Sequence, residues 1–157
     1  MSIAVFRIGL AIANTLAHQA YGSALASGRW HSLRTGLRPR RVIYTAGSRA
    51  LAQLEKRVHA NGIEPVGQAL FRVTLPDRLT VPTAESVGLP IRWRDSEAAT
   101  QAFGDRWLDA AAELALWVPS CVEPAEHNLL INAAHPRLSE VTLVIERDPF
   151  EFDPRLM

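Results

Sequence analysis

Residues 27–55 read SGRWHSLRTGLRPRRVIYTAGSRALAQLE, and this stretch decides both the fold and the placement of the chemistry. The Gly-Arg-Trp-His sequence at 28–31 predicts a turn, and the run 41–45 predicts a short strand that contains Tyr44. Ala46-Gly47-Ser48 leads into a helix, because serine is a favoured N-cap residue. Asn61-Gly62 closes that helix, as expected where the backbone turns left-handed.

One carboxylate on this predicted helix is out of place. Glu55 shares a helical face with Leu51, Leu54 and Val58, which is the stripe expected to face the core. Since burying a lone carboxylate is costly, Glu55 must be paired, hydrogen-bonded or lining a pocket. It is therefore either a structural ion pair with a nearby arginine or an active-site carboxylate that faces an arginine and aromatic side chains.

Composition places the chain among ordinary globular proteins. Its 157 residues are most simply one domain over 1–157, with 48% hydrophobic and 21% charged residues. The formal net charge of +1 gives no general reason to expect a nucleic acid partner. The basic cluster at Arg38, Arg40 and Arg41 lacks the interleaved aromatic residues of a nucleic-acid surface. Lys56 is the only lysine.

Several classes of site and location are disfavoured by the sequence. Cys121 is the only cysteine, which excludes an internal disulfide and fits a reducing compartment. No apolar run approaches the roughly 18 residues of a membrane span, and the N-terminal segment lacks the basic start of a signal peptide. The histidines show no paired ligand spacing, so we expect no metal site. These features predict a cytoplasmic protein with no membrane partner.

The remaining pattern alternates short strands with turns and short helices. Strands are predicted at 3–8, 41–45, 69–75, 114–118 and 141–145, with extended segments at 79–82 and 89–95. Residues 10–25 are expected to be partly helical, 96–103 and 105–112 to be two short helices divided by Gly104, and 126–132 to be a loop with buried leucines. Because no regular strand–helix–strand rhythm occurs, we expect an α+β fold with a mostly antiparallel sheet.

Ser120 and Asn128 are further polar candidates. Ser120 follows Pro119 at a predicted strand end, where a fixed backbone can present a hydroxyl to a cleft, although such a serine is more often a turn residue. Asn128 flanks the apolar Leu-Leu-Ile run and is either a ligand-binding amide or a brace for its loop.

A series of short pieces, in this order, resembles the RES-domain family, named for its Arg, Glu and Ser. The pieces, spread over nearly the whole chain, are Phe6-Arg7-Ile8, Gly28-Arg29-Trp30, Ile43-Tyr44-Thr45, Leu51-Ala52-Gln53-Leu54-Glu55, Gly104-Asp105-Arg106-Trp107-Leu108, Val118-Pro119-Ser120, Asn128-Leu129-Leu130-Ile131-Asn132, His135-Pro136 and Phe152-Asp153-Pro154-Arg155-Leu156. Two positions depart from the pattern: Ser27 stands where a second glycine is usual and His31 where an asparagine is usual.

The resemblance implies a compact α+β fold similar to the ADP-ribosyltransferase toxins, with a cleft that binds NAD. It implies the toxin half of a bacterial toxin–antitoxin pair, which cleaves NAD at the nicotinamide–ribose bond. The implied partner is an Xre-type antitoxin with a helix-turn-helix domain, which blocks the cleft in an oligomeric complex. The acceptor of the ADP-ribosyl group is left open between water, phosphate and a protein side chain.

The resemblance also implies roles for particular residues. Glu55 would supply a fixed negative charge and hold the ribose 2′-hydroxyl, and Ser120 would orient Glu55 or bind the ribose or the amide. Arg29 and, as a second candidate, Arg7 would grip phosphate or ribose oxygens.

Aromatic and amide side chains complete the implied site. Tyr44 and Trp30 would stack on the nicotinamide ring, and Asn128 would contact the nucleotide.

Three other functions compete with NAD depletion. A protein ADP-ribosyltransferase would use the same cleft with a different acceptor. A ribonuclease toxin would need a general base among basic residues, for which His31, near Arg29, Arg34 and Arg38, is the one candidate. A non-catalytic scaffold would bind its antitoxin and spare NAD.

Overall fold

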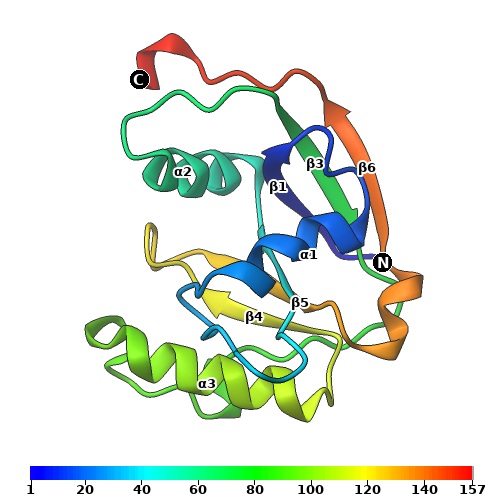
Figure 1. The fold of residues 1–157 in the computed structure, drawn as a ribbon, viewed down its shortest axis with the longest axis vertical. Helices are drawn as coiled ribbons and strands as arrows, with labels where there is room; N and C mark the ends of the chain where they lie inside the picture. The colour runs from blue at the N-terminus through cyan, green and yellow to red at the C-terminus, as the bar shows by residue number, and fades with distance from the viewer. Residues whose placement is uncertain (157) are drawn as a thin grey trace.

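Six strands form one antiparallel sheet in a computed structural model that describes residues 1–156 (Figure 1). The sheet order is β4-β5-β2-β1-β3-β6. Its strands are β1 (Ala4–Leu10), β2 (Val42–Ala46), β3 (Gln68–Thr74), β4 (Ala115–Pro119), β5 (His127–Asn132) and β6 (Thr142–Arg147). The helices are α1 (Leu16–Leu25), α2 (Arg49–Ala60) and α3 (Glu97–Ala110). This confirms the predicted α+β class with an antiparallel sheet.

The sheet parts in its middle, between β1 and β2. These strands pair only at Phe6 and Ala46, whereas β1 pairs with β3 along seven positions. Beyond that pair, side chains bond the free backbone groups of β2. The Arg7 guanidinium donates to the Tyr44 carbonyl at 2.8 Å, and the Val42 N–H donates to Ser23 Oγ of α1 at 2.9 Å. The split thus leaves these two buried backbone groups satisfied.

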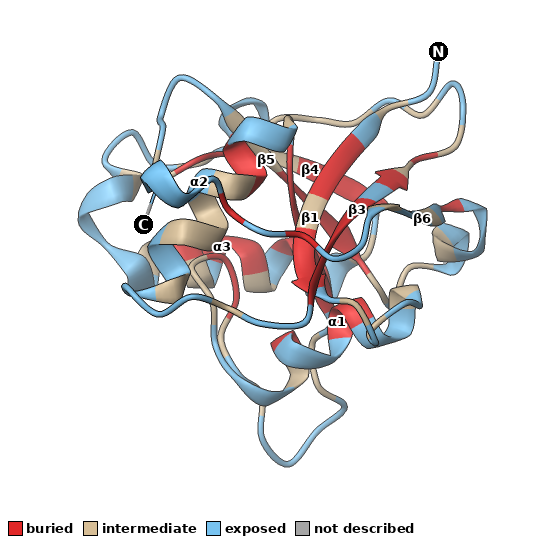
Figure 2. Cartoon of the chain, turned by 90° about the horizontal axis from the view of Figure 1, so that it is seen from above, coloured by how far each residue is buried: buried red, intermediate tan, exposed pale blue. Residues whose placement is uncertain are grey.

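Apolar residues on both faces of the sheet form the core, and Figure 2 shows burial concentrated in the strands and on the inner sides of the helices. One cluster surrounds Ile43 and Ile131, and a second joins α3 to β4 through Trp107 and Leu116. A third packs α2 against β1, and the tail residues Phe150 and Phe152 are buried in it.

The caps of α2 are as predicted, but its apolar stripe is not fully buried. Ser48 Oγ accepts from the Leu51 N–H at 3.0 Å, and Asn61 takes the left-handed conformation at the other end. Leu51 is buried, whereas Leu54 and Val58 are 45% and 57% exposed. The helix therefore rests on the core through only part of the face that the sequence indicates.

The prediction of a loop at 126–132 was wrong. Residues 127–132 form β5, which lies between β4 and β2 and pairs with both. Leu129, Leu130 and Ile131 are fully buried, because α3 and the rest of the core cover both faces of this strand. A strand buried on both faces has a continuous apolar run and lacks the alternation that identifies a strand in sequence.

Two segments expected to be extended are only partly so. Directly after 79–82, Thr83 forms an isolated parallel bridge to Trp117 of β4, so the chain lies along the sheet edge here without being a full strand. Within 89–95, the residues Trp93–Asp95 form a 3-10 turn. Among residues 1–156, no helix combines the length and apolarity needed to cross a bilayer.

The prediction that Gly104 divides two short helices was wrong. Gly104 lies inside the continuous helix α3, at the point where the backbone of the Gly28–His31 turn approaches the helix. A Cβ atom on residue 104 would lie 1.7 Å from the Trp30 carbonyl oxygen. Glycine is needed here for close approach, not for a helix break.

We expect Gly104→Ala to lower the free energy of unfolding by about 3 kcal/mol, since the overlap can be relieved only by moving backbone. Gly22→Ala in α1 is the matched control, because no atom lies within 4 Å of its Cβ position. That change should stabilise the helix by about 0.5–1 kcal/mol. Urea denaturation measures the free energy of unfolding of both variants. A Gly104→Ala protein as stable as wild type would contradict the packing described.

The arginine-rich segment between the turn at 28–31 and β2 is bound to α3. Arg34 and Arg40 both contact the Asp109 carboxylate, and the Ser32 N–H donates to Asp105 at 2.9 Å. The hydrogen bond from Arg40 lowers the pKa of Asp109, with smaller contributions from the charges of Arg40 and Arg34. These acids therefore anchor the arginine-rich segment to α3.

The lowered pKa of Asp109 predicts a pH dependence of stability. A carboxyl whose pKa is lower in the folded state stabilises the fold above its unfolded pKa of about 3.9 and loses this effect as pH falls through the folded pKa. Asp109→Asn should lower the free energy of unfolding at pH 7 by at most about 1 kcal/mol, because this pair is partly solvated. The difference from wild type should shrink below about pH 4; a difference independent of pH would contradict this assignment.

Candidate active site

The split between β1 and β2 opens into a cleft of about 690 Å³. Residues from both separated strands line it, together with α1, α2 and the turn at 28–31, and its volume lies within the range of small-molecule sites. Six of the residues predicted to act in the site line this cleft: Arg7, Arg29, Trp30, Tyr44, Glu55 and Asn128. The seventh, Ser120, lies directly behind it and bonds Glu55. The fold therefore brings together residues that are up to 121 positions apart in the sequence numbering.

Glu55 is held by two neutral donors. Its Oε1 accepts from Ser120 Oγ at 2.8 Å and from Asn128 Nδ2 at 2.6 Å. No salt bridge joins Glu55 to any other residue of the 1–156 range described by the structure. The alternative of a structural ion pair with an arginine is therefore not what the structure contains. Hydrogen bonds to a charged group contribute about 1.5–3 kcal/mol each, which offsets part of the cost of desolvating the carboxylate.

The β4–β5 hairpin presents both donors. Ser120 follows β4 directly and is fully buried, and its Oγ accepts from the Val122 and Glu123 N–H groups at 3.0 and 3.1 Å. Those two bonds fix the hydroxyl, whose single proton then goes to Glu55. Asn128 comes from β5, so correct formation of this strand is a condition for anchoring Glu55.

Three buried polar atoms of the cleft residues lack a hydrogen-bond partner in the described chain. They are Arg7 Nε, Arg29 Nε and Asn128 Oδ1. Buried donors and acceptors are nearly always satisfied in folded proteins, and exceptions concentrate where a ligand or water completes the network. The arrangement favours a polar ligand that brings acceptors for the arginines and a donor for the asparagine.

The two arginines are fixed differently. Arg7 reaches across the split to the Tyr44 carbonyl, and burial lowers the pKa of its guanidinium. Arg29 donates to the carbonyl oxygens of Trp93 and Arg94 at 2.9 and 3.0 Å, and its guanidinium carbon lies 5.7 Å from the centre of the Trp93 ring. One nitrogen of Arg29 therefore holds the 3-10 turn at Trp93–Asp95.

Buried His31 and half-buried Tyr44 form a hydrogen-bonded pair beneath the turn at 28–31. His31 is 1% exposed, and its Nε2 lies 2.9 and 3.0 Å from the carbonyl oxygens of Ser23 and Ala26. Since carbonyls only accept, Nε2 carries the proton, and Nδ1 accepts from the Tyr44 hydroxyl at 2.6 Å. The hydroxyl in turn accepts from the Trp30 N–H at 3.3 Å. Burial raises the pKa of Tyr44, which keeps this hydroxyl protonated.

The turn is built tightly against this pair. A Cβ on residue 28 would lie 2.6 Å from the Tyr44 hydroxyl, so the position requires glycine. Trp30, predicted to stack on a ligand ring, has its side chain in the core between Trp93 and Phe103, with 3% exposure. Tyr44 is less buried than Trp30 and is the better placed of the two to meet a ligand.

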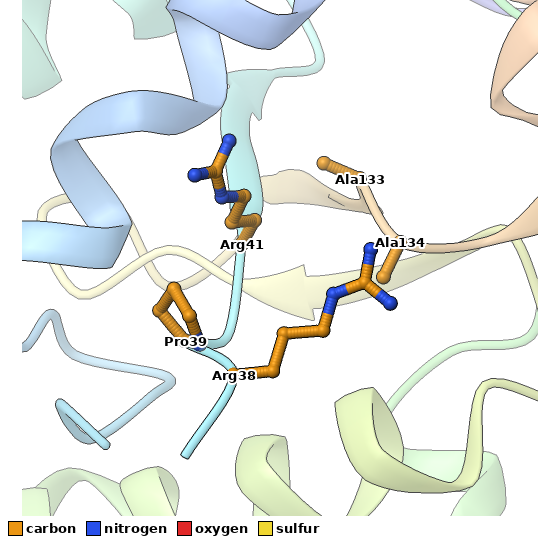
Figure 3. Close-up of a pocket in the computed structure, with 5 residues that line it drawn as sticks. All are labelled: Arg38, Pro39, Arg41, Ala133 and Ala134. Atoms are coloured by element: carbon orange, nitrogen blue, oxygen red, sulfur yellow. The ribbon is translucent and has the colours of Figure 1, made fainter. Parts of the chain in front are cut away.

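A second hollow, of about 300 Å³, lies away from this cleft (Figure 3). Arg38, Pro39, Arg41, Ala133 and Ala134 line it. The Arg38 guanidinium lies beside Ala134, whereas that of Arg41 is turned away from it. The lining holds no carboxylate or nucleophile, so this hollow offers no catalytic chemistry. In residues 1–156, no group of three or more His, Cys, Asp and Glu side chains is placed to hold a metal ion.

The chain is similar in sequence to known proteins. The sequence model of the RES domain matches residues 4–153. This chain belongs to the RES-domain toxin family. It is 34% identical to a protein named Prs ADP-ribosylating toxin from Sphingobium sp. (strain YBL2), covering 87% of this chain and 84% of that protein. It is 32% identical to the protein named Toxin Res from Yersinia enterocolitica, covering 87% and 88%.

The fold of this RES domain is also similar to that of a solved structure. A chain in the crystal structure of the M. tuberculosis MbcT–MbcA toxin–antitoxin complex superposes with a TM-score of 0.67 and 20% identity. The match covers 92% of this chain and 84% of that one. At this identity the likeness concerns the fold alone.

Sequence reasoning about this RES domain missed Lys56, Gln19 and the pairing of His31 with Tyr44. Lys56 and Gln19 line the cleft, the former beside Glu55 on α2 and the latter on α1. One signal was present for Lys56, since it is the only lysine in an arginine-rich chain. The pairing of His31 with Tyr44 had no local signal, because it depends on how the turn packs over β2.

We expect Tyr44→Phe to lower the free energy of unfolding by about 1–3 kcal/mol, because it leaves His31 Nδ1 and the Trp30 N–H buried without a partner. Tyr21→Phe removes a hydroxyl from a tyrosine that is 55% exposed and should change stability by less than about 0.5 kcal/mol. Urea denaturation of both variants makes the comparison. Equal stability of the two would show that the buried pair contributes nothing.

Proposed function

We propose that this RES domain is a toxin that depletes NAD by cleaving the bond between nicotinamide and ribose. The observation that carries the proposal is the anchoring of Glu55 at the cleft, where two neutral donors fix one carboxylate oxygen at 2.8 and 2.6 Å. Neither donor neutralises the carboxylate, so its negative charge stays available to a ligand.

This charge suits the reaction. As the C1′–N1 bond breaks, its electrons pass to the positively charged ring nitrogen, so nicotinamide leaves as a neutral molecule and needs no acid. The ribose develops oxocarbenium character, as in glycoside hydrolysis, which a fixed carboxylate stabilises. Glu55 Oε1 is bound by the protein, and Oε2 is the oxygen that would accept a hydrogen bond from a ribose hydroxyl. An oxygen of the acceptor then bonds to C1′ and loses its proton.

The other predicted site residues take supporting roles in this proposal. Ser120 and Asn128 position Glu55, and the free Oδ1 of Asn128 would accept a hydrogen bond from the nucleotide. Arg7 and Arg29, each with an unpartnered Nε, would bind phosphate or ribose oxygens. Tyr44, with Trp30 packed behind it, would contact the nicotinamide ring.

The acceptor distinguishes two versions of the activity. Water or phosphate would make the protein an NAD glycohydrolase or phosphorylase. Transfer to a protein side chain is favoured by one observation, the 34% identity to a relative named as an ADP-ribosylating toxin. Purified protein free of antitoxin should release nicotinamide from NAD by itself in the first case, and only after addition of a host protein in the second.

A ribonuclease activity finds little support in the same site. His31, the one histidine predicted for that role, is 1% exposed, with both ring nitrogens engaged. It therefore lacks the access to RNA that a general base requires.

We further propose that an antitoxin covers the cleft, as the resemblance to RES toxins suggested. The similar fold in the crystal structure of a toxin–antitoxin complex supports an antitoxin partner. An antitoxin of the Xre type with a helix-turn-helix domain is the expected partner, and co-expression with the neighbouring gene product would test it.

We expect Glu55→Gln to reduce NAD cleavage at least about a hundredfold, the usual loss when a transition-state electrostatic contact is removed. Glutamine keeps an oxygen for Ser120 and Asn128, so the change removes the charge while preserving the hydrogen bonds. The measurement is the rate of nicotinamide and ADP-ribose formation by chromatography.

Glu64→Gln is the control, since Glu64 is an exposed carboxylate outside the cleft. It should retain the wild-type rate. NAD cleavage by a folded Glu55→Gln protein at the rate of this control would refute the proposed role of Glu55, and wild-type protein that leaves NAD intact under every acceptor condition would refute the function.

A further inference from the structure

Lys56 and Arg7 are two cations of the cleft that share no carboxylate. Both line the cleft, Arg7 from β1 and Lys56 from α2. The positive charge of Arg7 lowers the pKa of Lys56, in addition to a larger effect of burial. Among residues 1–156, no salt bridge includes either side chain. Two like charges thus line the same partly desolvated cleft.

This pair of cations destabilises the folded protein when no ligand is bound. Each cation loses hydration, and their mutual repulsion adds to that loss. The Arg7 guanidinium uses one nitrogen for the Tyr44 carbonyl and leaves Nε buried without an acceptor. An anionic ligand with several oxygens would supply acceptors to both groups and remove the repulsion.

The position of Lys56 relative to Glu55 separates two parts of the cleft. Adjacent residues of an α-helix project about 100° apart, so the ammonium and the carboxylate face different portions of the site. A ligand that contacts both must carry its anionic group some distance from the sugar that meets Glu55.

We propose that Arg7 and Lys56 form a subsite for the diphosphate of a nucleotide. The two positive charges match the two negative charges of the phosphoanhydride in a dinucleotide or in ADP-ribose. The cleft volume of about 690 Å³ accommodates a ligand larger than a mononucleotide sugar. This inference rests on the proposed function for the identity of the ligand, but the subsite itself is testable with a diphosphate alone.

Lys56 is the residue to change, because Arg7 also bonds the backbone of β2. Isothermal titration calorimetry would measure binding of inorganic pyrophosphate and of ADP-ribose to the full chain and to Lys56→Gln. We expect Lys56→Gln to weaken both about tenfold, the loss typical of one charge-assisted hydrogen bond. Lys56→Arg should restore most of the affinity, and nicotinamide, which has no phosphate, should bind all forms alike.

Arg57→Gln is the matched control for charge. Arg57 is the next residue of α2, lies outside the cleft lining, and donates to the Leu156 carbonyl at the end of the chain. The Arg57→Gln change should leave pyrophosphate affinity within about twofold of wild type, because a charge outside the cleft is screened by solvent and salt.

Thermal unfolding provides a second measurement. Removing Lys56 should leave the melting temperature of the ligand-free protein unchanged or raise it, since repulsion and desolvation are relieved, whereas pyrophosphate should stabilise wild type more than Lys56→Gln. A lowered melting temperature without ligand would indicate a structural role for Lys56 and overturn the proposal. Pyrophosphate binding that is absent in wild type, or equal in wild type and Lys56→Gln, would also overturn it.

The two proposals fail separately. Pyrophosphate bound through Lys56 by a protein that never cleaves NAD would support the subsite and reject the reaction. NAD cleavage with no effect of Lys56→Gln on diphosphate binding would reject the subsite and keep the reaction.

Discussion

The structure depends on how the backbone of β2 is satisfied where β1 leaves it. After the pair Phe6–Ala46, the strands separate, and an unpaired strand edge in the interior would ordinarily be unfavourable. Arg7 bonds the Tyr44 carbonyl and Ser23 bonds the Val42 N–H. These side chains allow a cleft within a continuous sheet, and because Arg7 is charged, the same contact gives the cleft a buried cation.

In the cleft, the Glu55 carboxylate lies on a helix that faces a sheet edge built from other segments. Glu55 is set on α2 by local sequence, whereas Ser120 and Asn128 come from the hairpin of β4 and β5. Neutral donors orient the carboxylate and leave its charge in place. An arginine partner would instead cancel that charge. Glu55 comes from α2 and Asn128 from β5, and Ser120 directly follows β4. Side chains on or next to regular elements are placed more precisely than those on loops.

The turn at 28–31 depends on residues distant in sequence. The buried bond between His31 and Tyr44 fastens it from below, and Gly104 lets α3 approach its backbone from the other side. His31 stands at the position where the sequence pattern led us to expect asparagine. In this chain both its ring nitrogens are engaged within the protein, so the departure affects the support of Tyr44.

The sequence by itself determined the antiparallel α+β class, the limits of α2 through Ser48 and Asn61, and the unusual position of Glu55. Those conclusions rest on periodicity and capping, which are local. Only the tertiary structure decided that 127–132 is a central strand, that Gly104 lies within one helix, and that Trp30 is buried. It also decided that Glu55 is hydrogen-bonded to Ser120 and Asn128 and forms no ion pair with an arginine, an alternative that periodicity had left open. Each of these outcomes depends on which distant segment packs against a residue, and spacing along the chain carries no record of that contact.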